Sequence, residues 1–446
     1  MLFTSPPAAI RTAAQAQDWG SKRGFDVVDY SVGSGATLEK AQQSGFVWVK
    51  AWLSWRRMEP SPGTYAWQLG ANDLDNILNG AAAYGRRVLI RVDEPPFWAT
   101  HDGSGRPYAV DAAALQEFMH ALATYASNRA GAYILFNEPN LVGEWGQSVT
   151  ADGAAHYATL VRAAHAGVKT GSPGLPLVAA GLASNAGGGA GNMDDLEYLR
   201  AFYAAGARGA FDALGTHPYG GNTPPGQDPS ICGGICFRRA ELQRQIMVEF
   251  GDEATPMWAT EIGWLHENSY DLGGYNWMKV SAQQQAEYLA GAYRYAEQYW
   301  SWMGPMFVFN LDYSTAQWCG GLCYPRTDAI YWFSVLNQDR TPRPAYNALA
   351  SLGAPLPPAP TPSATRTATA TASSTATATP TATSTGTRTP TATVAVSSTP
   401  TPSQTPSAAA TATPTATQTA TPTHTPEGSA TTTALPGEAT ATATPT

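Results

Sequence analysis

The chain alternates between short apolar runs and longer stretches in which apolar residues recur every three or four positions. The short runs are mostly continuous, as expected for strands that are buried on both faces. They lie at residues 24–30, 46–52, 87–93, 132–138, 177–183, 213–217, 257–261 and 306–311. The helical spacing between them occupies residues 72–84, 111–127, 150–169, 194–205, 238–250 and 281–299, with a last helix at 343–352.

This alternation of strand and helix predicts a (β/α)8 TIM barrel over residues 24–353. The alternative is a doubly wound open sheet, which normally carries a glycine-rich fingerprint after its first strand. Gly33-Ser34-Gly35 follows the first strand but lacks the rest of that fingerprint. The glycine-rich run at 187–191 has no Lys-Ser/Thr behind it, so we interpret it as a loop and not as a phosphate cradle.

The segments that flank the predicted barrel have a different character. Residues 1–23 form a lead segment without the charged-then-apolar layout of a secretion signal. Residues 354–446 are rich in Thr, Ala, Pro and Ser and contain no aromatic residue, which predicts a disordered tail or linker. Because Thr/Ser-rich segments with Pro resemble O-glycosylated stalks, we expect an extracellular or cell-surface protein with possible attachment through this tail.

The composition of the chain argues against some classes of function and favours others. Charged residues make up 13% of the chain and the net charge is −8, which argues against a nucleic-acid partner. No apolar run reaches the roughly 18 residues of a membrane span. Aromatic residues make up 11%, with 14 Trp and 20 Tyr, which suits a groove where rings stack on sugar faces. A Trp-rich core is the alternative, and a monomer without cofactor or metal is expected.

Four cysteines form two similar pentapeptides, Cys232-Gly-Gly-Ile-Cys236 and Cys319-Gly-Gly-Leu-Cys323. Outside the cell they are expected to form two disulfides, either within each pentapeptide or between the two. A single zinc site that uses all four thiolates, and free thiols, are the alternatives. The pairing therefore stays open at this stage.

Two glutamates close two of the predicted strands. Glu138 follows an apolar run and precedes Pro139, which cannot continue a sheet ladder, and Glu261 precedes Ile262-Gly263-Trp264. The carboxyl ends of barrel strands meet at one face, so the two side chains are expected to face each other there. Paired carboxylates across a sugar-sized gap are the groups that glycoside hydrolysis requires. The other polar and aromatic residues at strand ends are Trp52, Trp55, Arg91, Asp93, Glu94, Asn137, His217, Tyr219, Trp264, Asp312 and Tyr313.

At these motifs the chain resembles the retaining glycoside hydrolases of the large barrel clan, with the acid/base after strand 4 and the nucleophile after strand 7. The motifs Glu59-Pro60 to Trp67, Phe136 to Asn140, Thr216 to Gly220 and Thr260 to Trp264 are most similar to families 39 and 5. The resemblance covers about residues 24–352. It implies a secreted β-glycosidase that acts on a polysaccharide or oligosaccharide by double displacement.

The resemblance also implies roles for single residues. Glu261 is the expected nucleophile and Glu138 the expected acid/base. Asn137 is expected to bind the sugar 2-hydroxyl, Tyr219 to hydrogen-bond the nucleophile, and His217 to line the same subsite. Arg91 is expected to help keep Glu261 ionised. Candidate stacking platforms are Trp264 and Trp332, followed by Trp52, Trp55 and Trp98.

The chain departs from the family 5 pattern at strand 8, where Phe307 to Tyr313 contains no tryptophan. No small β domain follows the barrel, which favours an open cleft and endo cleavage. The sugar is not fixed, although Arg91 and two arginines of the rim, Arg238 and Arg239, would suit an acidic one.

The rival hypothesis is a non-catalytic carbohydrate-binding barrel displayed on a glycosylated stalk. An esterase or peptidase lacks support because no Gly-x-Ser-x-Gly elbow is present. A metal hydrolase also lacks support, because the seven histidines show no His-Glu-x-x-His spacing.

Overall fold

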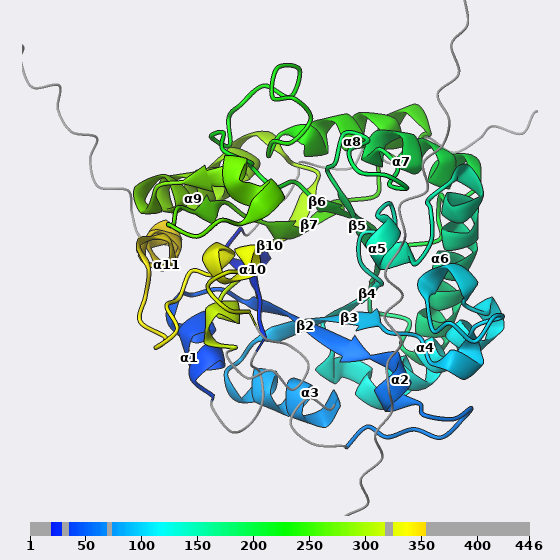
Figure 1. The fold of residues 1–446 in the computed structure, drawn as a ribbon. Helices are drawn as coiled ribbons and strands as arrows, with labels where there is room; N and C mark the ends of the chain where they lie inside the picture. Colours follow the sequence, from blue (N-terminus) through cyan, green and yellow to red (C-terminus); the bar gives the residue numbers. More distant parts are fainter. Residues whose placement is uncertain (1–18, 29–34, 69–73, 317–323, 354–446) are drawn as a thin grey trace, which may run out of the picture. The chain divides into compact units, whose positions relative to one another are not determined.

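Eight parallel strands close into a barrel in the computed structural model, which describes residues 19–28, 35–68, 74–316 and 324–353 (Figure 1). Each strand pairs with its two neighbours in parallel register. Around the barrel the order is β1 (Arg23–Asp26), β10 (Met303–Val308), β7 (Met257–Ile262), β6 (Ala213–His217), β5 (Leu177–Ala183), β4 (Ala132–Leu135), β3 (Arg87–Asp93) and β2 (Trp48–Ser54). The predicted (β/α)8 barrel is confirmed.

Helices surround the barrel (Figure 1). The longer ones are α1 (Ala36–Gln43), α3 (Leu74–Ala83), α4 (Ala112–Ala126), α6 (Ala151–Gly171), α7 (Asp195–Ala204), α8 (Arg239–Glu249), α9 (Ala282–Tyr299) and α11 (Pro344–Ala350). Short elements at the strand ends are α2 (Trp55–Met58), α5 (Val142–Trp145), α10 (Ala329–Phe333) and a small sheet of β8 (Leu265–His266) and β9 (Lys279–Val280). Side-chain caps set several helix starts: Asp111 accepts hydrogen bonds from two backbone amides of α4, and Ser281 forms a capping box with Gln284 in α9.

The barrel interior changes from apolar to polar along its strands. One end is filled by a cluster made up of Trp48, Leu89, Ala132, Ile134, Val178, Ala213, Trp258 and Phe307. Trp48 and Trp258 pack edge to face with ring centroids 5.3 Å apart. Because side chains on one face of a strand are two residues apart, the next inward position on β2 after Trp48 is Lys50. The interior therefore carries a charged side chain just above its apolar floor.

The bounds of β3, β5 and β6 are as the sequence predicts, whereas the other five strands differ by one to four residues at one or both ends, most informatively β4 and β10. β4 ends at Leu135 and not at Glu138, because Phe136 and Glu138 have φ values of 61° and 33°, outside the extended region. β10 begins at Met303, although the Gly304-Pro305 pair argues against a strand there. Its pairing with β7 is irregular between Met303 and Met306, where the missing N–H of Pro305 is accommodated.

The flanking segments lie mostly outside the described residues. Of the predicted lead segment, a short 3-10 helix (Trp19–Lys22) precedes β1. The predicted disordered tail at 354–446 and the Cys319–Cys323 pentapeptide are not among the described residues, so both expectations stay predictions. None of the described helices combines the length and the apolar character needed to cross a bilayer.

Candidate active site

Glu138 and Glu261, which are far apart in the sequence, line the same cavity of about 870 Å³ at the carboxyl ends of the strands. One carboxylate oxygen of each residue and a ring nitrogen of His217 lie within 4.8 Å of one another. Glu261 belongs to β7, whereas Glu138 follows β4 in a left-handed backbone conformation that is costly for a residue other than glycine. The structure thus brings together the two carboxylates that the strand ends predict to meet.

Both oxygens of the buried Glu261 carboxylate have a donor. Lys50 Nζ donates to Oε1 at 2.6 Å, and the Tyr219 hydroxyl donates to Oε2 at 2.7 Å. Burial by itself would raise the pKa of Glu261, but His217, Lys50 and Arg91 together outweigh it and lower that pKa well below the ordinary value. Burial and the charge of Glu261 raise the pKa of Tyr219, so this phenol stays a neutral donor.

Lys50 is a buried cation that the sequence analysis did not single out. Its ammonium lies 2.7 Å from Asp26 Oδ2 as well as 2.6 Å from Glu261, so it bridges two carboxylates inside the barrel. The Tyr313 hydroxyl donates to the other oxygen of Asp26 at 3.0 Å. Burial raises the pKa of Asp26, with Lys50 acting in the opposite direction. The signal in the sequence was a lone lysine within an otherwise apolar strand.

His217 links the two glutamates. Its Nδ1 lies 2.7 Å from Glu138 Oε1 and 3.6 Å from Glu261 Oε2. Its Nε2 lies 3.0 Å from the Thr260 hydroxyl, which fixes the ring orientation. A side chain on Gly181 would collide with this ring, because a Cβ there would lie 2.2 Å from it. Strand β5 therefore leaves room for the imidazole.

The same Glu138, His217 and Glu261 atoms form a donor set of the kind that holds divalent metals. The chemistry of the site does not fit a metal well, since the Lys50 ammonium already neutralises Glu261 at 2.6 Å. Both ring nitrogens of His217 also have hydrogen-bond partners within the protein. We therefore derive no metal-dependent step, and the expectation of a metal-free site stays a prediction.

Asn137 and Arg91 lie beside the glutamates and line the cavity with them. Asn137 Nδ2 donates to Glu144 Oε1 at 3.0 Å, a partner on α5 that the sequence analysis missed. Arg91 pairs with Asp93 at 3.2 Å, and its Nε has no hydrogen-bond partner among the described residues. Both side chains are thus close enough to act on a ligand held by the glutamates.

The structure corrects the predicted tryptophan platforms. Trp264 is completely buried, packs against Phe237 and donates to a backbone carbonyl, so its ring faces cannot contact a sugar. Trp55 is equally buried. Trp332 stacks on His266 and is not among the residues that line the cavity.

Two further candidates lie nearer the surface. Trp98 packs edge to face on Trp55 and lines neither cavity, so the structure does not support it as a platform. Trp52 lines an adjoining cavity of about 580 Å³ and stays a candidate for contact with substrate.

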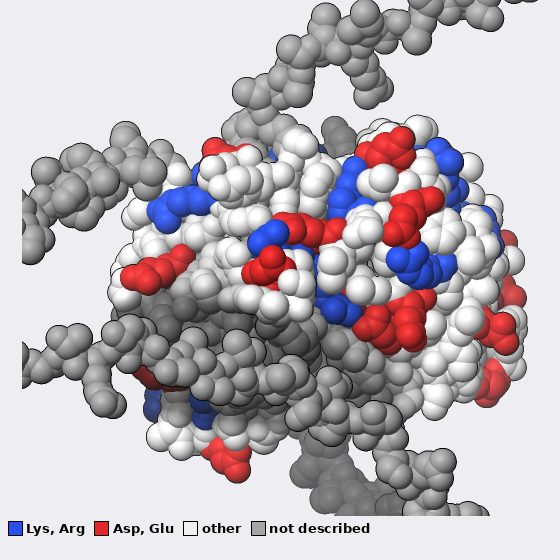
Figure 2. Space-filling model, turned by 90° about the horizontal axis from the view of Figure 1, so that it is seen from above, with Lys and Arg blue, Asp and Glu red and all other residues white. Residues whose placement is uncertain are grey.

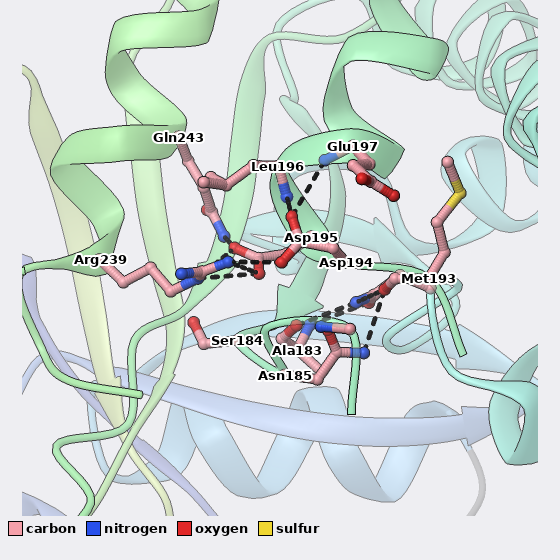
Figure 3. A network of polar contacts seen from close by, with 12 residues as sticks. Ala183, Ser184, Asn185, Met193, Asp194, Asp195, Leu196, Glu197, Arg239 and Gln243 are labelled. Atoms are coloured by element: carbon pink, nitrogen blue, oxygen red, sulfur yellow. Dashed lines mark hydrogen bonds and ion pairs between the residues drawn. The ribbon is translucent and has the colours of Figure 1, made fainter. Parts of the chain in front are cut away.

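The rim of the larger cavity is fixed by a disulfide and a buried ion pair. Cys232 and Cys236 form a disulfide within their own pentapeptide, and the neighbouring Ile235 lines the cavity. Arg239 points toward Asp194 and Asp195 at the start of α7, where Gln243 also donates to Asp195 (Figure 3). These contacts tie the start of α8 to the loop after β5.

The same contacts bear on the expectation that the arginines of the rim, Arg238 and Arg239, suit an acidic sugar. Arg238 pairs with Glu241 at 2.9 Å, and Arg239 is buried in its pair with Asp195. Both guanidinium groups are thus paired with carboxylates of the protein and do not favour a substrate carboxylate. On the face shown in Figure 2, acidic and basic side chains are interspersed and do not form a field of one sign.

Comparison with known proteins shows what this barrel is similar to. A family 39 glycoside hydrolase from the gut symbiont Bacteroides cellulosilyticus WH2 is 20% identical, with a TM-score of 0.54 over 76% of this chain and 64% of that protein. A glucosidase from Croceicoccus marinus is 17% identical, with a TM-score of 0.51 over 74% and 66% of the two chains. The β-glycosidase BGL167 is 15% identical, with a TM-score of 0.52 over 78% of this chain and all (100%) of that one.

These likenesses confirm the predicted barrel fold, which solved glycosidase structures share. The chain spans about two thirds of the length of the first two relatives, 64% and 66%. No protein-family model and no curated protein matches the sequence. What the barrel does must therefore be argued from its own residues.

Glu144 leads to a prediction about pH and stability. Burial, helped by the charges of Asp93 and Glu138 and opposed by Arg91, raises the pKa of Glu144 from 4.5 to about 7. The folded chain therefore binds this proton more tightly than the unfolded chain, and the free energy of unfolding falls as the pH rises from 4.5 to 7. We expect Glu144→Gln to remove this loss, which amounts to roughly 1.4 kcal/mol per unit of pKa.

Thermal unfolding of both proteins between these pH values measures the effect. The Tm of Glu144→Gln minus the Tm of the wild type is expected to increase as the pH rises. The exposed Glu297, on α9, offers the matched control Glu297→Gln, whose Tm should follow the wild type throughout. A constant Tm difference between Glu144→Gln and the wild type across the range would contradict the prediction.

Proposed function

We propose that the chain is a retaining β-glycosidase that hydrolyses O-glycosidic bonds of a polysaccharide or oligosaccharide. The observation that carries the proposal is the approach of one carboxylate oxygen of Glu138 to one of Glu261, to within 4.8 Å, at the carboxyl ends of β4 and β7. Retaining glycosidases hold their carboxyl groups about 5–5.5 Å apart, whereas inverting enzymes leave about 6.5–9.5 Å for a water molecule. The short separation supports direct attack by one carboxylate.

Glu261 is the nucleophile in this proposal. Its lowered pKa keeps it ionised, and the two donors Lys50 and Tyr219 fix the orientation of its carboxylate. In the first step it forms a bond to the anomeric carbon while the bond to the leaving oxygen breaks. Glu138 gives its proton to that oxygen, so the leaving group departs as a neutral alcohol.

In the second step a water molecule replaces the leaving group. Glu138, now ionised, takes a proton from the water, whose oxygen attacks the anomeric carbon and releases Glu261. The His217 imidazole, at 2.7 Å, steadies Glu138 through both steps. The sugar leaves with its original anomeric configuration after two inversions.

We propose further that the protein acts outside the cell. The disulfide of Cys232 and Cys236 supports an oxidising compartment, and the Thr/Pro-rich residues 354–446 resemble a surface stalk. Immunodetection of the chain in culture medium and surface fractions tests this proposal. Detection in the cytosolic fraction alone would refute it.

The function itself is tested by a reducing-end assay on a panel of β-linked polysaccharides: hydroxyethylcellulose, glucomannan, arabinoxylan and galactan. The full chain is compared with Glu261→Ala and Glu138→Ala. Release by the wild type alone is the expected result, and it also names the substrate class. Equal binding of one polysaccharide by all three proteins, without cleavage, would replace the enzyme by a carbohydrate-binding barrel.

A further inference from the structure

The cavity that holds the two glutamates adjoins a second one. The larger, of about 870 Å³, and the smaller, of about 580 Å³, share Arg91, Glu144, Tyr313 and Tyr324 in their walls. Each volume is by itself within the roughly 300–1,000 Å³ of sites that take drug-sized ligands. Together the two adjoining cavities offer more space than the single sugar at the glutamates requires.

An exposed aromatic ring lines each of the two cavities. Phe97 is 55% exposed and lines the smaller cavity, with the Arg56 guanidinium 4.1 Å from its ring centroid. Tyr275 is 52% exposed and lines the larger cavity. A ring that is exposed in the wall of a cavity offers a flat apolar face to a ligand held there.

Trp277 is a third exposed aromatic residue, and it lies near the larger cavity. It is 47% exposed and lies beside Gly221, where an added Cβ would be 3.0 Å from the Trp277 ring and 3.1 Å from the carbonyl oxygen of Ile235. Ile235 itself lines the larger cavity, whereas Trp277 does not, so Trp277 lies outside that cavity near one residue of its wall. Burial raises the pKa of Tyr275, and this ring shares the wall of the larger cavity with Glu138.

Charged side chains line both cavities, among them Arg56, Arg91, Glu94, Arg106 and Asp328, and two of the arginines have partners within the protein. Arg91 pairs with Asp93, and Arg56 donates to the backbone carbonyl oxygens of Pro95 and Gly105. Burial keeps Glu144 neutral up to a pH of about 7. Such walls suit the hydroxyl groups of an uncharged sugar, while flat rings suit its C–H faces.

We propose that the two adjoining cavities form one groove for an internal stretch of an uncharged β-linked polysaccharide. Phe97 is the stacking platform at one end, and Tyr275 with Trp277 forms the platform at the other. A chain that rests on both ends passes the glutamates in its middle, so cleavage is endo. This inference rests on the proposed function and adds its substrate class and mode of action.

The test uses the full chain with Phe97→Ala, Trp277→Ala and the double variant Tyr275→Ala/Trp277→Ala. Tyr299→Ala is the matched control, because Tyr299 is 57% exposed but ends α9, at the opposite end of the barrel from the glutamates. The substrates are hydroxyethylcellulose, glucomannan and arabinoxylan, together with the nitrophenyl β-glycosides of their sugars.

On the polysaccharide that the wild type cleaves, kcat/KM is expected to fall roughly tenfold in the platform variants, as loss of one aromatic contact implies. On the nitrophenyl glycosides, which are too short to reach Phe97 or Trp277, the single variants Phe97→Ala and Trp277→Ala should stay within about twofold of the wild type. The wild type should also lower the viscosity of the polymer well before reducing ends accumulate. Release of short sugars at constant viscosity, or platform variants that match Tyr299→Ala, would overturn the proposal.

A separate measurement distinguishes failure of the groove from failure of the proposed function. Glu261→Gln is run through native gels that contain each polysaccharide, alone and combined with Trp277→Ala or Phe97→Ala. Retardation that both platform substitutions abolish supports the groove even if the wild type cleaves nothing. Absence of retardation by every polysaccharide overturns the groove, whatever the result of the cleavage assay.

Discussion

Glu261→Gly is expected to abolish hydrolysis and to regain turnover of an activated aryl β-glycoside when azide is added. The loss should exceed the roughly 10²- to 10⁴-fold that a general acid–base residue supplies, because no covalent intermediate can form. Azide fits the space that the side chain leaves and attacks from the same face as the missing carboxylate. The product is therefore the α-glycosyl azide.

Glu138→Ala is the matched comparison. With a dinitrophenolate leaving group the first step needs no acid, so this variant should form the glycosyl-enzyme and then stall. Azide then replaces water in the second step and yields the β-glycosyl azide. The opposite configurations assign the two roles, and Glu297→Ala, which removes an exposed glutamate of α9, should leave activity unchanged. Recovery of the same anomer from both variants would contradict the assignment.

Lys50→Met is expected to move the acidic limb of the pH profile of kcat/KM to higher pH. The substitution leaves Asp26 and Glu261 buried without the cation that now lies 2.7 Å and 2.6 Å from them. The pKa of Glu261 then rises, so the nucleophile is protonated at a higher pH than in the wild type. Breaking a buried ion pair in this way costs about 3–5 kcal/mol of stability.

The direction of the stability effect follows from the same pKa. Because the folded chain lowers the pKa of Glu261, its contribution to stability is present above the ordinary value of 4.5 and is lost as the pH falls through the folded value. The difference in Tm between wild type and Lys50→Met should therefore be largest near neutral pH and narrow in acid. Thermal unfolding and kcat/KM, each measured as a function of pH, check the two parts.

Two further variants separate charge from packing. Lys50→Arg keeps the cation, so its acidic limb should stay close to that of the wild type even if the larger side chain lowers the Tm. Asp26→Asn removes the second carboxylate that Lys50 contacts, so the ammonium acts on Glu261 alone. The pKa of Glu261 should then fall, and the acidic limb should move to lower pH. An acidic limb that stays in place in both Lys50→Met and Asp26→Asn would show that the pair is only structural.

Part of the site could be predicted because its signals are local. Pro139 lies a few residues beyond the end of β4 and Gly263 directly follows β7, and barrel topology places all such strand ends at one face. His217 is the last residue of β6 and Tyr219 lies two residues beyond it, so both are predicted at the same face. For these residues the position along a strand is enough to bring the side chains together.

Only the tertiary structure decided which way a side chain points and how deeply it is buried. Whether Lys50 points inward, and which carboxylates it meets, is set by the register of β2 against β1 and by closure of the barrel. Trp264 looked like a platform at a strand end, yet the ring is buried beside Phe237. Glu144, on α5, gains its raised pKa from burial in the wall of the cavities at the strand ends.

The sequence by itself therefore determined the barrel and the face at which its polar residues gather, because strand periodicity and strand ends are local properties of the chain. The tertiary structure decided which of those residues are exposed and which charges neutralise one another. Burial and Coulomb interactions depend on distances between strands such as β1, β2 and β7, which are remote in the sequence and adjacent or opposed only in the closed barrel.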